Sequence, residues 1–269
     1  MHATIFALIA AVNATKDIAY AADVPQDKHR LDVYAPAGVR NAPVVIFIHG
    51  GGFVQGDRRD YNGLATAIAS TGVVVVVPSY RLFPQTDARG AAQDVAAAAG
   101  WTLKHIAAYG GNSRGFVLCG HSSGGYLAAL VGLDPEFLSA DGIAGSSVRG
   151  IAGFSGTYDV REIDPEATPS ARALLQRFFG ATPEARGALS PITYAAKTSP
   201  PVVLFCGGVY DAPACGQRDA FFAALVGAGA TVQMDADASA THAGVVANLS
   251  RNDTPEQRAL LDFVAKYAH

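Results

Sequence analysis

Residues 120–124 read Gly-His-Ser-Ser-Gly, a G-x-S-x-G pattern that can carry nucleophilic chemistry. The pattern follows the apolar run 116–119 and precedes a helix-like stretch from Gly125, so it sits between an expected strand and an expected helix. A sharp turn there presents the hydroxyl of Ser122 at the carboxyl end of the strand, and the helix N-terminus favours a developing negative charge. The alternative is an ordinary Gly/Ser turn before a helix.

A second motif, His-Gly-Gly-Gly-Phe at 49–53, follows the apolar run 44–48. Residues without side chains let backbone N–H groups approach a substrate, and acyl transfer needs such donors aimed at the oxyanion. We expect the amides of Gly51 and Gly52 to be two of these donors, with the Ser123 amide as the third. A glycine run after a strand can also cradle phosphate, but the chain has no G-x-x-x-x-G-K-[ST], and no G-x-G-x-x-G opens a helix here.

A nucleophilic serine needs a base, and the base needs an acid that orients it. With these motifs the order along the chain is nucleophile, acid, histidine. Asp211 comes shortly after an expected strand and is the expected acid, with Asp219 and Asp235 as rivals. His242 is the expected base because it lies in the loop between the last expected strand and the last helix. The alternatives are a solvated loop aspartate and an exposed loop histidine.

The other six of the seven histidines are weaker candidates for the base. His49 and His121 belong to the two motifs, where a histidine more often supports the loop, and the rest are terminal or lie on polar ground before Ser122. The chain contains no H-E-x-x-H and no paired histidines, which disfavours metal-assisted hydrolysis. We therefore expect neither a metal nor another cofactor.

Apolar, β-branched runs alternate with helix-like stretches along the chain. The expected strands are residues 16–20, 30–35, 44–48, 73–77, 116–119, 148–154, 201–206 and 231–234. The expected helices are residues 63–70, 87–108, 125–133, 170–179, 217–226 and 254–268. This alternation predicts an α/β fold with a central, mostly parallel eight-stranded sheet and helices on both faces.

Two segments depart from the alternation. Residues 160–199 are polar and punctuated by proline, and they are too long for an ordinary loop, so we expect a small lid insertion there within one domain at 16–269. The apolar run 4–12 is far too short to cross a bilayer, and no Lys or Arg precedes it as in a signal peptide. We expect an N-terminal helix at 1–15, with a signal-like segment as the alternative.

Composition excludes several classes of protein. The 269 residues are 50% hydrophobic and 16% charged, which excludes a disordered chain. The net charge is -3 and no basic stripe stands out, so no nucleic-acid partner is expected. Three cysteines form a sparse, odd set, and we expect free thiols in a cytoplasmic protein, or a secreted protein if residues 1–14 act as a signal peptide. One disulfide and a homodimer both stay open.

These features together resemble an α/β-hydrolase of the hormone-sensitive-lipase-like carboxylesterase group, and they are similar to the bacterial esterases and arylformamidases that share its core. Besides the two motifs, the resemblance rests on Leu-Asp-Val-Tyr-Ala-Pro at 31–36, Pro-Ser-Tyr-Arg-Leu at 78–82 and Ser-Gly-Thr-Tyr-Asp at 155–159. It covers the chain from about Lys16 to the C-terminus. It implies that Ser122 is the nucleophile, Asp211 the acid and His242 the base. It also implies an oxyanion hole formed by the amides of Gly51, Gly52 and Ser123.

The chain also departs from that group. Gln85 follows Pro84 at a position where the group often has an acidic residue, and residues 207–211 match the lipase-like acid motif only loosely. A formamidase often has an aromatic residue at the position of Gly52, so the glycine here favours ester over formamide substrates.

The resemblance implies a serine carboxylesterase that hydrolyses short- to medium-chain or small aryl esters through an acyl-enzyme, with a small-molecule ester as its partner. One alternative is an arylformamidase with the same three residues, and another is a non-catalytic binding protein on this fold. We expect Arg58 and Arg59 to form a solvated turn. Six aromatic residues are expected either to line a substrate pocket or to pack in the core, namely Phe53, Tyr80, Phe83, Tyr158, Phe178 and Phe179.

Overall fold

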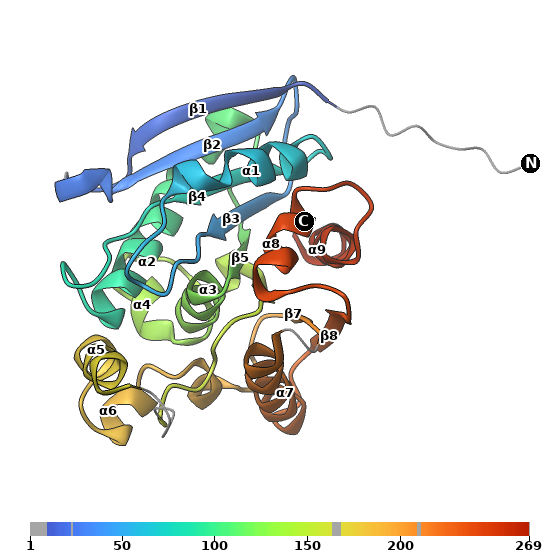
Figure 1. Ribbon diagram of the computed structural model, residues 1–269. Helices are drawn as coiled ribbons and strands as arrows, with labels where there is room; N and C mark the ends of the chain where they lie inside the picture. The colour runs from blue at the N-terminus through green and yellow to red at the C-terminus, as the bar shows by residue number, and fades with distance from the viewer. Residues whose placement is uncertain (1–9, 23, 163–167, 209–210, 269) are drawn as a thin grey trace, which may run out of the picture.

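In the computed structural model, eight strands form one sheet across the part of the chain that is described (Figure 1). The structure describes residues 10–22, 24–162, 168–208 and 211–268. The strands lie in the order β1-β2-β4-β3-β5-β6-β7-β8. Their bounds are β1 Val12–Ala19, β2 Arg30–Pro36, β3 Val44–Ile48, β4 Val74–Pro78, β5 Phe116–His121, β6 Val148–Phe154, β7 Val202–Gly207 and β8 Val232–Asp237.

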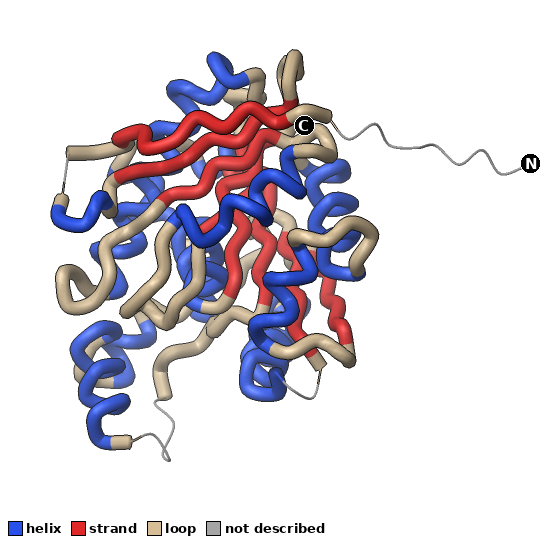
Figure 2. Tube along the Cα trace, turned by 45° about the horizontal axis from the view of Figure 1, so that its top comes forward, coloured by secondary structure: helices blue, strands red, loops and turns tan. Residues whose placement is uncertain are grey.

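Helices lie on either side of this sheet (Figure 2). In the described residues they are α1 Asn62–Ala69, α2 Ala88–His105, α3 Ser123–Leu133, α4 Pro135–Ala140, α5 Pro169–Phe179, α6 Pro183–Gly187, α7 Ala212–Gly227, α8 His242–Leu249 and α9 Pro255–Tyr267. All six expected helices are present. The helices α4, α6 and α8 are additional to those expected from the sequence, and helices as short as these form only where tertiary packing supports them.

The direction of the strands places the two motifs side by side. The pairs β1–β2 and β2–β4 are antiparallel, and the remaining pairs from β4 to β8 are parallel. Ile48 at the end of β3 pairs with Gly120 near the end of β5, so the residues that follow both strands meet at one edge of the sheet. The predicted mostly parallel, eight-stranded sheet is confirmed.

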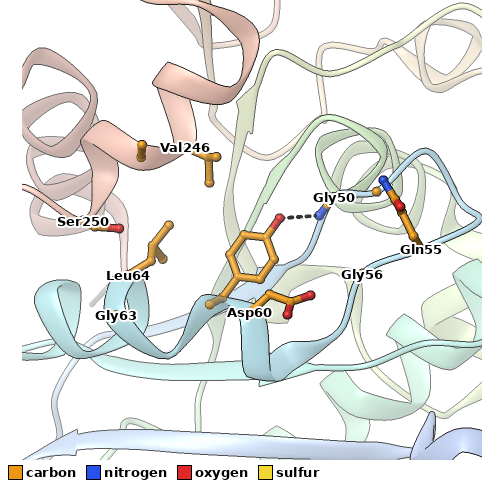
Figure 3. Close-up of a pocket in the computed structure, with 11 residues that line it drawn as sticks. Gly50, Gln55, Gly56, Asp60, Gly63, Leu64, Val246 and Ser250 are labelled. Carbon is orange, nitrogen blue, oxygen red and sulfur yellow. Dashed lines mark hydrogen bonds between the residues drawn. The ribbon is translucent and has the colours of Figure 1, made fainter.

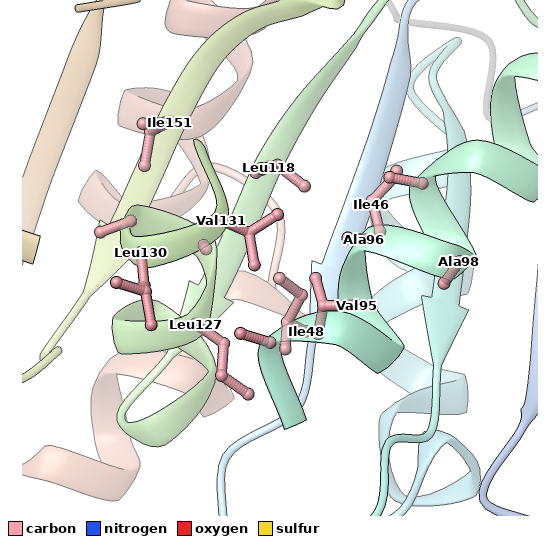
Figure 4. Packing of buried hydrophobic residues seen from close by; sticks show 14 of the residues in the cluster. Ile46, Ile48, Val95, Ala96, Ala98, Leu118, Leu127, Leu130, Val131 and Ile151 are labelled. Carbon is pink, nitrogen blue, oxygen red and sulfur yellow. The ribbon is translucent and has the colours of Figure 1, made fainter. Parts of the chain in front are cut away.

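The strand β3 shows how the sheet builds a core on each face. All five of its side chains are buried, and successive side chains point to opposite faces. Ile46 and Ile48 join the core that contains Val95 of α2 and residues of α3, which Figure 4 shows from close by. Val45 and Phe47 join the other core, with residues of α1, α8 and α9. A continuous apolar strand is therefore what a sheet covered on both faces requires.

For residues 12–15, the structure corrects the N-terminal helix that the sequence predicted at 1–15. Residues 12–15 belong to β1, where Asn13 pairs with Ala35 and Thr15 pairs with Val33 of β2. The strand β1 thereby covers an edge of β2 that would otherwise present unpaired backbone groups. Residues 1–9 lie outside the described residues.

The described part of residues 160–199 contains α5, α6 and a short 3-10 helix at Pro191–Tyr194, and it contains no strand. Ring centroids of Phe178 and Phe179 on α5 lie 4.5 and 5.2 Å from that of Phe53 in the second motif. Five of the six aromatic residues singled out above are buried and Phe83 is half-buried, so these rings pack in the core. Residues 163–167 lie outside the described residues, and the lid remains a prediction.

The expectation of free thiols is wrong for two cysteines. Cys206 in β7 and Cys215 in α7 form a disulfide, with their Cα atoms 5.4 Å apart. Cys119 is a free, buried thiol. The two bonded cysteines are nine residues apart, and only the reversal of the chain from β7 into α7 brings them together.

Arg58 does not lie in a solvated turn, because its side chain is fully buried. Its Nε donates to Asp32 Oδ1 at 3.1 Å, and its Nη1 donates to the Asp27 carbonyl at 3.2 Å and to Ser79 Oγ at 3.3 Å. Its Nη2 also pairs with Asp17 of β1. These contacts join β1, β2 and the end of β4 to the segment that follows the second motif.

We expect Arg58→Ala to lower the free energy of unfolding by about 3–5 kcal/mol, because Asp32 would keep a buried charge without its partner. Urea unfolding followed by circular dichroism measures the change. Arg59→Ala is the matched control, since Arg59 is 57% exposed and its ion pair with Asp57 should contribute no more than about 1 kcal/mol. Equal losses from the two substitutions would contradict the stabilising role of the buried Arg58–Asp32 pair.

Candidate active site

Ser122 occupies the sharp turn between β5 and α3. Its backbone has φ 55° and ψ −123°, a conformation that residues other than glycine rarely adopt. Its amide donates to the carbonyl of Phe154 at 2.8 Å. The flanking glycines are required because a Cβ on Gly120 would lie 2.2 Å from the Gly124 carbonyl oxygen, and one on Gly124 would lie 2.0 Å from that of Ile48. The turn therefore forms only when the backbones of β3, β5 and α3 approach this closely.

Asp211 and His242 are brought together from the segments that follow β7 and β8. His242 Nδ1 and Asp211 Oδ1 are 2.7 Å apart. The aspartate is buried, whereas the imidazole is 44% exposed. With the Nδ1 proton donated to Asp211, the Nε2 atom is left as a proton acceptor. His242 is the first residue of α8 rather than a loop residue, and the side chain of Thr241 caps that helix.

One pocket of about 510 Å³ holds all three of these side chains. Its lining residues are Ser122, Ser155, Thr157, Asp211, Pro213, Ala214, Gln217 and His242. Residues separated by up to 120 positions in the sequence thus meet at the carboxyl edge of the sheet. That edge is where open α/β sheets bind ligands.

The rival acids lie elsewhere. Asp219 is 58% exposed and pairs with its neighbour Arg218 at 2.7 Å. Asp235 accepts a hydrogen bond from the Ala236 amide. Among the described residues, neither of these carboxylates contacts a histidine.

Ser155 is a site residue to which the sequence analysis gave no role, although it begins the Ser-Gly-Thr-Tyr-Asp stretch at 155–159. It follows the end of β6, and its Oγ donates to Asp211 Oδ2 at 2.5 Å. The Gly207 amide donates to the same oxygen at 3.1 Å. Three donors therefore satisfy the buried carboxylate, and Oδ1 is directed to His242. The sequence signal for Ser155 is its position directly after an expected strand, because the carboxyl ends of the parallel strands meet at the edge of the sheet that holds Ser122.

The residues 49–53, here called the glycine loop, lie against the turn that holds Ser122. A Cβ on Gly50 would be 3.4 Å from the Ser122 Cβ and 3.0 Å from the His121 carbonyl oxygen. Gly51 has φ 128° and Gly52 has φ 61°, both in the region that favours glycine. Within the described residues, none accepts a hydrogen bond from the Gly51 or Gly52 amide, so both are free to donate to a bound group.

The two motif histidines support loops. His121 Nε2 donates to the carbonyl of His242 at 2.8 Å, and His49 Nδ1 donates to the Gly50 carbonyl at 2.8 Å. Burial lowers the pKa of His49 to about 4. Burial, with the nearby His242, lowers the pKa of His121 to about 4 as well. Both rings are neutral near neutral pH.

Across the described residues, no group of three or more metal-ligating side chains is present, and no helix is long and apolar enough to cross a membrane.

A strained serine after β5, with an Asp–His pair drawn from the segments after β7 and β8, defines an α/β-hydrolase. The model of the BD-FAE family matches residues 31–214. The chain therefore belongs to the BD-FAE family.

Two curated relatives of the chain carry the names of ester hydrolases. The chain is 29% identical over 175 residues to the probable carboxylic ester hydrolase LipM of Mycobacterium tuberculosis. The matched region covers 62% of this chain and 41% of the relative. It is 26% identical over 235 residues to the isoprenylcysteine alpha-carbonyl methylesterase ICME of Arabidopsis thaliana, with coverage of 81% and 54%. The chain thus spans about half the length of these relatives.

Among solved structures, the chain is similar to esterase B from Lactobacillus rhamnosis inhibited with a tributyrin phosphonate. The TM-score is 0.77 at 26% identity, with 94% of this chain and 85% of that chain covered. A truncated carbohydrate esterase from gut microbiota has a TM-score of 0.81 at 19% identity, with coverage of 96% and 97%, which shows a common fold.

We expect the protein to lose stability between pH 7 and pH 5 because of its two buried histidines. The unfolded chain binds protons at His49 and His121 near their ordinary pKa of 6.5, whereas the folded protein takes them up only near pH 4. The free energy of unfolding should therefore fall by roughly 2 kcal/mol for each histidine over this interval. Urea unfolding at pH 7, 6 and 5 measures the slope, and an equal stability at all three would contradict it.

Proposed function

We propose that the protein is a serine carboxylesterase in which Ser122 is the nucleophile, His242 the base and Asp211 the acid. The observation that carries the proposal is the 2.7 Å hydrogen bond between Asp211 and His242 in the pocket that Ser122 also lines. The curated relatives named above are ester hydrolases, which favours an ester substrate over the arylformamidase alternative.

In the proposed reaction, His242 Nε2 takes the proton of Ser122 Oγ as the oxygen attacks the ester carbonyl carbon. The amides of Gly51, Gly52 and Ser123 donate to the oxyanion of the tetrahedral intermediate. His242 then returns the proton to the leaving alcohol, and water attacks the acyl-enzyme by the same route. Asp211 holds the imidazole in the tautomer that keeps Nε2 available and stabilises its charged form.

The proposed substrates are short- to medium-chain or small aryl esters. The pocket of about 510 Å³ is in the range that holds a small organic molecule. The rings of Phe53, Phe178 and Phe179 pack on each other and do not line this pocket, which limits the apolar surface available to a long acyl chain.

Ser122→Ala should lower kcat on a p-nitrophenyl short-chain ester by a factor on the order of 10⁶. It should also abolish labelling by a fluorophosphonate probe, because that probe reacts with the serine oxygen. Ser139→Ala is the control, since Ser139 is exposed and lies outside the pocket. Activity of the Ser122 variant within tenfold of the wild type would refute the assignment, and faster turnover of N-formylkynurenine than of any ester would refute the substrate class.

The disulfide bears on where the protein works. A bond between Cys206 and Cys215 favours an oxidising compartment, because cytosolic thiols are kept reduced. We therefore propose a secreted location in place of the cytoplasmic one expected from the sequence.

The test is to unfold freshly isolated protein without a reductant, alkylate its thiols and locate the modified cysteines by mass spectrometry. We expect Cys119 to be alkylated and Cys206 and Cys215 to remain bonded to each other. Three alkylated cysteines would contradict the proposal. The homodimer stays a prediction.

A further inference from the structure

The glycine loop also borders a second pocket, on the side of α1 and α8. This pocket has a volume of about 490 Å³, and Gly50, Gly51, Tyr61 and Val246 are among the residues that line it. The close-up in Figure 3 shows it between the glycine loop and α8. The pocket does not include Ser122 or His242. The loop is therefore exposed to open space on this side and needs something to hold it in place.

The Gly50 amide is held by a tyrosine. Gly50 N donates to the Tyr61 hydroxyl oxygen at 3.0 Å, the bond that the dashed line in Figure 3 marks. We propose that Tyr61 is a positioning residue for catalysis, which fixes the Gly50 peptide so that the following amides of the glycine loop point at the oxyanion. This inference rests on the proposed esterase function and names a residue that acts through the loop.

The position of the Tyr61 hydroxyl is itself fixed. Its ring packs on Phe47 of β3, with centroids 5.3 Å apart, and on His49 at 6.3 Å. The tyrosine ends the short 3-10 helix that contains the buried Arg58, which is tied to β2 and to the end of β4. Burial raises the pKa of Tyr61, so its hydroxyl stays neutral at neutral pH. The Tyr61 hydroxyl thus connects the glycine loop to the segment that the fully buried Arg58 anchors.

Backbone bonds secure the far side of the glycine loop, whereas side chains secure its near side. The Gly51 carbonyl accepts from the amides of Val54 and Gln55 at 3.3 and 3.1 Å. On the near side, the Tyr80 hydroxyl donates to the His49 carbonyl at 3.0 Å, and His49 Nδ1 donates to the Gly50 carbonyl at 2.8 Å. Gly50 N–H is the donor on this nearer side, and its partner is Tyr61. Without the Tyr61 hydroxyl, water from the second pocket can bind the Gly50 amide, and only the Tyr80 bond to the His49 carbonyl still directs this peptide.

The test is Tyr61→Phe, which keeps the ring and removes only the hydroxyl. We expect kcat on a p-nitrophenyl ester to fall about tenfold with KM changed less than twofold, because preorganised amides act mainly on the transition state. A matched thionoester reports on the amides directly, since sulfur accepts their hydrogen bonds poorly. The ratio of kcat for ester to kcat for thionoester should fall in the variant. Tyr194→Phe, which loses a hydroxyl bond to the Ala188 carbonyl outside both pockets, should leave that ratio unchanged.

An unchanged ratio, or a kcat within twofold of the wild type, would overturn the role of Tyr61. If the variant does not fold, hydrogen exchange of the Gly50 amide in the wild-type protein decides. Slow exchange supports the role of Tyr61, and exchange at the rate of an open loop overturns it. Wild-type protein that hydrolyses no ester, or whose activity survives Ser122→Ala, would refute the proposed function instead, so the two failures are distinguishable.

Discussion

The hydrogen bond between Asp211 and His242 is the interaction on which the site depends. It joins a buried carboxylate after β7 to a half-exposed imidazole at the start of α8, so it exists only when both segments end at the same edge of the sheet. Burying a carboxylate is costly unless its oxygens are satisfied. Ser155 and Gly207 supply the remaining donors, and they come from the ends of two neighbouring parallel strands. The order of the strands in the sheet therefore determines whether the Asp211 carboxylate can be buried with its oxygens satisfied.

A second constraint is how closely three backbones approach around Ser122. The positions of Gly120 and Gly124 leave no room for a side chain, and the serine between them holds a positive φ. Such strain persists only when the surroundings determine it. Here the surroundings are the two apolar cores that pack on opposite faces of the sheet. The buried charge of Arg58 then ties the antiparallel edge of the sheet to the segment after the glycine loop.

Three histidines at this edge differ in role because they differ in burial. His49 and His121 are buried and neutral, and each donates one proton to a backbone carbonyl. His242 is the one of the three that meets a carboxylate and keeps part of its ring exposed to solvent. A base must exchange protons with a substrate in the pocket, and a buried imidazole whose charged form is disfavoured cannot do so readily. The same residue type thus serves structure in two places and is available for chemistry in the third.

The sequence by itself determined the elements and the motifs. Runs of β-branched residues predict the sheet because their side chains suit strands, and the Gly-x-Ser-x-Gly spacing predicts the turn at Ser122 because few sequences tolerate it. Only the tertiary structure decided which charges and thiols meet. The burial of Arg58, the bond from Cys206 to Cys215 and the contact of Ser155 with Asp211 each join segments whose proximity no local pattern records. Propensity and periodicity act over a few residues, whereas these contacts depend on how the strands are ordered in the sheet.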